Sequence, residues 1–92
     1  MKENTRVELE STDDPNVMIV HTNRELSESI EVYHSPAEAA NGTPLAALLG
    51  SIEGIIGLEL NDRDMKIKRD PNIAWENIEL EVIEILKDFY LL

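Results

Sequence analysis

Basic residues gather in one short stretch of this 92-residue chain. Half of its 8 lysines and arginines, namely Arg63, Lys66, Lys68 and Arg69, fall within residues 63–69, whereas the formal net charge of the whole chain is −11. A local positive patch of this kind can bind an acidic segment or a phosphate group. The alternative is a solvated strand face whose lysines protect a sheet edge from pairing. We take these four residues as the candidate partner-binding site.

The residue types that bind zinc or iron–sulfur clusters, cysteine and histidine, are sparse in this chain. The sequence has no cysteine, which excludes thiolate zinc sites and cysteine-ligated iron–sulfur clusters within this chain. His21 and His34 lie on different predicted strands without a metal-ligand spacing, so we interpret them as scattered histidines. Four carboxylates lie on one face of the last predicted helix, and they fit either a solvated surface or a weak iron site: Glu76, Glu79, Glu84 and Asp88. We expect no resident metal or cofactor, and weak iron binding is left open.

No sequence pattern indicates catalysis. The chain lacks a Gly-x-Ser-x-Gly turn and a glycine-rich phosphate loop, and its carboxylates show no recognisable pairing. The acidic excess argues against binding to nucleic acids or to anionic membranes. Residues 1–6 lack an apolar stretch, and no run approaches the ~20 apolar residues of a membrane span. We therefore expect a cytoplasmic protein that is not an enzyme.

Short alternating runs predict the strands that position these residues. Residues 7–10 and 30–33 alternate apolar and polar side chains, whereas residues 17–20 are apolar on both faces, which is typical of an interior strand. Residues 56–60 and 64–68 alternate again and predict a hairpin, with Ile56 on the same apolar face as Leu58 and Leu60. The strands at 7–10 and 64–68 are the candidate sheet edges.

Two Ser/Thr-Pro signals mark helix starts. The first, at residues 35–36, predicts a short helical turn that ends near residue 42, and the second, at residues 43–44, begins a helix that stops at Gly54. Residues 54–57 are interpreted as the turn that follows. A longer helix carries an apolar stripe composed of Trp75, Ile78, Val82, Ile85, Leu86 and Phe89.

These elements predict a single α+β domain over residues 1–92. Its sheet is small and antiparallel or mixed, two helices pack on it, and the element order is βββ-α-ββ-α. Trp75 lies on the apolar stripe, so we interpret it as a core anchor at the start of the last helix rather than as a binding hot spot.

Four stretches of the chain form an ordered set of motifs. They are Thr-Asp-Asp-Pro-Asn at 12–16, Ser-Pro-Ala-Glu-Ala at 35–39 leading to Thr-Pro-Leu-Ala at 43–46, Ile-Glu-Gly-Ile at 52–55 followed by Asp-Met at 64–65, and Trp at 75 with Asp-Phe at 88–89. In this order and spacing, residues 8–90 resemble the N-terminal domain of the Nfu/NifU-like iron–sulfur scaffold proteins. The resemblance identifies Pro15, Asn16, Pro44, Gly54 and Trp75 as structural positions of the family pattern.

The chain departs from that pattern in three respects. Ile19 and Leu80 stand where the family commonly has a lysine and a proline, and the cluster-holding Cys-x-x-Cys domain of full-length members has no counterpart in this sequence. The resemblance therefore implies a stand-alone, protein-binding accessory domain in iron–sulfur cluster assembly or delivery, with assembly or client proteins as partners. Two alternatives are a general peptide-binding module that uses the basic patch and a weak carboxylate iron binder.

Overall fold

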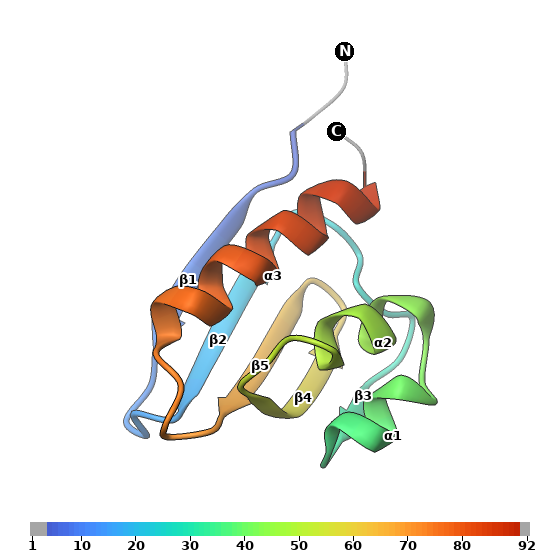
Figure 1. Ribbon diagram of the computed structural model, residues 1–92. Helices are drawn as coiled ribbons and strands as arrows, with labels where there is room; N and C mark the ends of the chain where they lie inside the picture. Colours follow the sequence, from blue (N-terminus) through green and yellow to red (C-terminus); the bar gives the residue numbers. More distant parts are fainter. Residues whose placement is uncertain (1–3, 91–92) are drawn as a thin grey trace.

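Five antiparallel strands form one sheet, in the order β1-β2-β5-β4-β3 (Figure 1). The computed structural model describes residues 4–90, so the ends of the expected domain, residues 1–3 and 91–92, lie outside the described residues. The strands are β1 (Val7–Ser11), β2 (Val17–Thr22), β3 (Glu31–Tyr33), β4 (Ile55–Asn61) and β5 (Asp64–Arg69). An α+β fold with an antiparallel sheet is thus confirmed.

The central strand of the sheet is β5. The prediction of an edge strand is confirmed for residues 7–10, but it is wrong for residues 64–68, because β2 pairs with the side of β5 that β4 leaves free. The interior position expected for the doubly apolar run is confirmed in β2, which lies between β1 and β5. Consequently the lysines of β5 do not protect an edge.

Three helices complete the fold: α1 (Pro36–Ala40), α2 (Pro44–Gly50) and α3 (Trp75–Tyr90). Each of the first two begins at a hydroxyl cap followed by proline. The Ser35 Oγ accepts the Glu38 N–H at 3.2 Å, and the Thr43 Oγ1 accepts the Ala46 N–H at 3.4 Å. The expected helical turn is thus a helix in its own right, and the order becomes βββ-αα-ββ-α. None of the helices within residues 4–90 has the length and apolarity needed to cross a bilayer.

The core lies between the sheet and the two longer helices, which cover the same face of it (Figure 1). Alternate residues of the strands supply one side of the core, and Leu49 of α2 with Ile78, Val82 and Leu86 of α3 supply the other. Phe89, expected on the apolar stripe, is instead 41% exposed. Because the helices lie on one face only, the other face of the sheet is uncovered.

The β1–β2 turn is fastened to the beginning of α3. The Trp75 indole donates its Nε1–H to the carbonyl of Pro15 at 2.8 Å. The Arg69 guanidinium donates to the Asn16 Oδ1 at 3.3 Å and to the Ile73 carbonyl at 3.2 Å, and it lies 5.1 Å from the centre of the Trp75 ring. We call the group formed by Pro15, Asn16, Arg69, Ile73 and Trp75 the turn–helix junction.

Gly54 also lies beside this junction. Its φ of +102° is one that residues with a side chain rarely adopt, and a Cβ there would lie 2.6 Å from the Ile73 Cγ2. The Gly54 carbonyl accepts the Asp70 N–H at 2.7 Å. The turn into β4 therefore requires glycine for both its conformation and its close packing.

Candidate protein-binding face

The uncovered face of the sheet is built by strand alternation. Because Met18, Val20, Leu58, Leu60, Met65 and Ile67 point into the core, their neighbours along each strand point outward. The outward residues, which we call the open face, are Glu8, Glu10, Val17, Ile19, His21, Val32, Gly57, Glu59, Asn61, Asp64, Lys66 and Lys68.

The two lysines of the predicted basic site lie together on this open face. Lys68 lies between Val17 and Gly57 of the neighbouring strands, and Lys66 lies between Ile19 and Glu59. Both side chains are exposed, and neither forms an ion pair with a carboxylate of residues 4–90. Lys68 is therefore a cation with uncharged cross-strand neighbours on a strongly acidic molecule.

The two arginines of the predicted site lie elsewhere. Arg69 belongs to the turn–helix junction, where its guanidinium is already hydrogen-bonded. Arg63 lies in the β4–β5 turn, about 20 Å from Arg69 at the ~3.3 Å rise of a strand residue. The structure thus brings together two of the four residues rather than one continuous patch.

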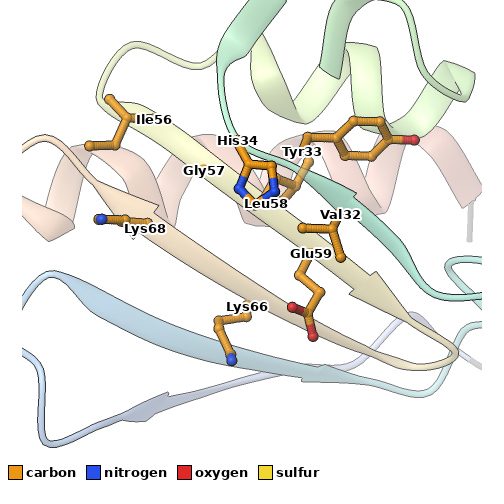
Figure 2. A pocket seen from close by; sticks show the side chains of 9 residues that line it. All are labelled: Val32, Tyr33, His34, Ile56, Gly57, Leu58, Glu59, Lys66 and Lys68. Atoms are coloured by element: carbon orange, nitrogen blue, oxygen red, sulfur yellow. The ribbon is translucent and has the colours of Figure 1, made fainter. Parts of the chain in front are cut away.

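A hollow of about 360 Å³ opens on the side of this face formed by β3, β4 and β5. Figure 2 shows the side chains of Ile56, Lys68, Lys66, Glu59 and Val32 around it, with His34 beside β3. Gly57 contributes no side chain to this hollow, and a Cβ added there would lie 3.3 Å from the Lys68 Cβ. The volume is at the lower end of the roughly 300–1,000 Å³ range of ligand sites.

Ile56 reaches this hollow because of a bulge in β4. Ile55 lies opposite Arg69 while Gly57 lies opposite Lys68, so Ile56 is an extra residue without a partner on β5. Ile55 is 3% exposed and Ile56 is 37% exposed. The prediction that Ile56 shares the inward face with Leu58 is wrong, because the bulge shifts the alternation by one residue.

His21 bridges two carboxylates at the other end of the open face. Its Nε2 lies 2.7 Å from the Glu10 Oε1 and its Nδ1 lies 2.8 Å from the Asp64 Oδ1. The hydrogen bond with Glu10, which is the largest cause, and the hydrogen bond with Asp64 raise the pKa of His21 above 6.5. Both bonds favour the doubly protonated ring. This cross-strand tie was missed in the sequence, since its members lie 11 and 43 positions from the histidine.

The described residues hold no suitable metal centre. Within residues 4–90, no group of three or more His, Asp or Glu side chains is arranged to bind a metal ion. The two carboxylates next to His21 contact opposite sides of its ring, and His34 lies at the hollow instead. The sequence has no thiol for a cluster, so the residues present do not fit an iron–sulfur cluster as a resident group.

Four of the five family-motif positions meet at one end of the domain. Pro15, Asn16 and Trp75 form part of the turn–helix junction, and Gly54 lies next to it. Trp75 also packs against the core. Pro44 lies apart from these residues, as the first residue of α2.

Comparison with known proteins places the chain in a family. Residues 7–91 match the family model described as scaffold protein Nfu/NifU N terminal. The X-ray structure of protein SAV1430 from Staphylococcus aureus resembles this chain with a TM-score of 0.71 and 11% sequence identity, covering 88% of this chain and 98% of that chain. At this identity the likeness shows the fold alone, and no match was found among curated proteins. The family match confirms the sequence resemblance: the chain belongs to the Nfu/NifU N-terminal family.

Proposed function

We propose that this chain is a non-catalytic accessory domain that binds a protein partner in iron–sulfur cluster assembly or delivery. The observation that carries the proposal is membership of a scaffold family associated with iron–sulfur clusters, in a sequence without cysteine. Without thiolates the chain has no means of holding a cluster in the usual way. Contact with a protein that does hold or receive a cluster needs no cysteine in this chain, which supports the proposal.

The open face is the surface we propose for this contact. It belongs to a sheet whose other face is already occupied by α2 and α3, so a partner can approach it without displacing any described element (Figure 1). It combines apolar side chains, such as Ile19 and Val32, with charges of both signs. This mixture is typical of interfaces that form between proteins folded beforehand.

Site-specific photo-crosslinking in cells tests this proposal. A benzoylphenylalanine at Ile19, on the open face, is compared with one at Leu80, which is 63% exposed on α3. Both positions point toward solvent on their own layers, so neither replacement disturbs the core. We expect the Ile19 probe to capture iron–sulfur assembly or cluster-carrying proteins, identified by mass spectrometry, and the Leu80 probe to capture far less of them.

Three results would contradict the proposal. Adducts that contain no protein of iron–sulfur metabolism would remove the assignment to this process. Adducts of equal yield from Ile19 and Leu80 would remove the open face as the contact surface. A partner that binds α3 instead of the open face would give more adducts from the Leu80 probe than from the Ile19 probe.

A further inference from the structure

The bulge in β4 places the apolar side chain of Ile56 on the open face instead of in the core. Ile56 and Val32 are 37% and 46% exposed, and both face the hollow between β3 and β5 (Figure 2). In a regular strand Ile56 would lie on the inward face with Leu58 and would not reach the hollow. Bulges commonly redirect a side chain next to a binding site, and here the redirected residue lines a hollow that Gly57 keeps open.

The charges around the hollow select the sign of its occupant. Lys68 has Val17 and Gly57 as cross-strand neighbours, and it has no ion-pair partner within the described chain. Lys66 is partly balanced by Glu59, which lies opposite it in β4. One anionic group beside Lys68 is therefore complementary to this surface, whereas a run of several anions would meet Glu59.

Apolar contacts around the hollow select the chemical class of that anion. A phosphate ion would use Lys68 but would leave Val32 and Ile56 in water. A peptide that presents a carboxylate next to an aliphatic side chain would use both features, because it pairs with the lysine and covers the apolar side chains.

We propose that the hollow binds an acidic–apolar peptide segment of a partner protein, with a carboxylate on Lys68 and an aliphatic side chain on Ile56 and Val32. This inference rests on the proposed function, since it names the kind of segment that the open face receives. Glu59 makes the site selective for segments in which acidic and apolar residues alternate over those with consecutive acids.

Nuclear magnetic resonance titration of the isotope-labelled protein tests the inference. The probe is an acetylated and amidated hexapeptide of alternating glutamate and leucine. Three comparison probes are the alternating lysine–leucine hexapeptide, hexaglutamate and inorganic phosphate. We expect the first probe alone to shift the backbone amides of residues 32–34, 56–59 and 66–68 in a saturable manner, and the shifts to weaken as salt is added, because the pairing is screened.

Matched variants separate the two contacts. Lys68→Glu should weaken binding of the glutamate–leucine peptide about tenfold or more, because it places like charges together. Lys87→Glu makes the same charge change on exposed α3 and should leave binding within about twofold of wild type. Ile56→Ser should weaken the same peptide without increasing the response to phosphate. Both residues changed in the hollow are exposed. The amide spectrum of each variant serves as the check of whether it is folded.

Several outcomes would overturn the inference. One is an equal loss of binding in Lys68→Glu and Lys87→Glu. Others are the same shifts with phosphate or hexaglutamate, or stronger shifts with the lysine–leucine peptide. Shifts that depend on protein concentration without any peptide would indicate a second copy of the chain as the occupant. If the peptide fails while Ile19 still crosslinks to an assembly or client protein, the inference falls and the proposed function stands. If the peptide binds and the crosslinked proteins are unrelated to iron–sulfur clusters, the proposed function falls instead.

Discussion

Replacing Arg69 by lysine should destabilise the domain although it preserves the charge. The guanidinium donates to Asn16 and Ile73 from two nitrogens while stacking on Trp75, and a lysine ammonium cannot reach all three at once. Arg63→Lys is the matched control, because no hydrogen bond or ion pair of the Arg63 side chain is formed within residues 4–90.

The expected loss follows from these contacts. A hydrogen bond to a charged group contributes about 1.5–3 kcal/mol. The two bonds here, at 3.2 and 3.3 Å, are longer than the common ~2.9 Å, and lysine can retain one of them. The cation–π contact adds about 0.5–1 kcal/mol, of which lysine keeps a part. The net loss is about 2 kcal/mol, which corresponds to a fall in Tm of about 8–16 °C for a domain of this size.

Urea and thermal unfolding followed by circular dichroism measure this difference. We expect Arg63→Lys to remain within about 0.5 kcal/mol of wild type. In a double-mutant cycle, Arg69→Lys and Trp75→Phe should couple by about 0.5–1 kcal/mol, because the two side chains are in contact. Equal stability of the Arg69→Lys and Arg63→Lys variants would refute the assignment of Arg69 to the turn–helix junction. Arg69 would then again be a candidate partner-binding residue.

Three further predictions concern the tie on the open face, the turn into β4 and the core. The raised pKa of His21 means that its stabilising contribution is complete below pH 6.5 and is lost as the pH rises through the folded-state value; urea unfolding over this range should show the decline in wild type and not in His21→Gln. Gly54→Ala should lower the free energy of unfolding by about 1–3 kcal/mol or more in the same assay, since it combines the strained φ with a clash. Leu86→Ala, at a fully buried position, should cost about 2–5 kcal/mol, whereas Leu80→Ala, at a 63% exposed position on the same helix, should cost under about 1 kcal/mol; similar losses at both would contradict the described core.

Local patterns in the sequence are sufficient to predict most of the elements. The hydroxyl–proline pairs at residues 35–36 and 43–44 locate both short helices, since each supplies a cap and a preset φ at the first turn. Alternation in residues 64–68 places Lys66 and Lys68 on one face. The strand order, in contrast, does not follow from local patterns. One side of β5 pairs with β4 in the hairpin, and the pairing of its other side with β2 depends on residues more than 40 positions away.

The candidate site was only partly predictable for a related reason. The clustering of basic residues in the sequence places Arg69 in the same candidate site as the two lysines. Period-two alternation instead places it on the opposite face, where it contacts Trp75. The exposure of Ile56 depends on the bulge, and no local residue choice distinguishes a bulged Gly-Ile-Ile-Gly from the turn that the glycines suggested. The His21 tie likewise exists only once β1, β2 and β5 are adjacent.

The turn–helix junction has a practical consequence for any laboratory that studies this chain. It contains the single tryptophan of the sequence, so the indole emission of the whole protein originates where α3 meets the β1–β2 turn. That position lies on the helical layer, behind the sheet from the open face. Tryptophan emission should therefore change when α3 separates from the β1–β2 turn. It should not change when a ligand binds the open face. Unfolding and ligand binding can then be followed as separate signals in one unlabelled sample.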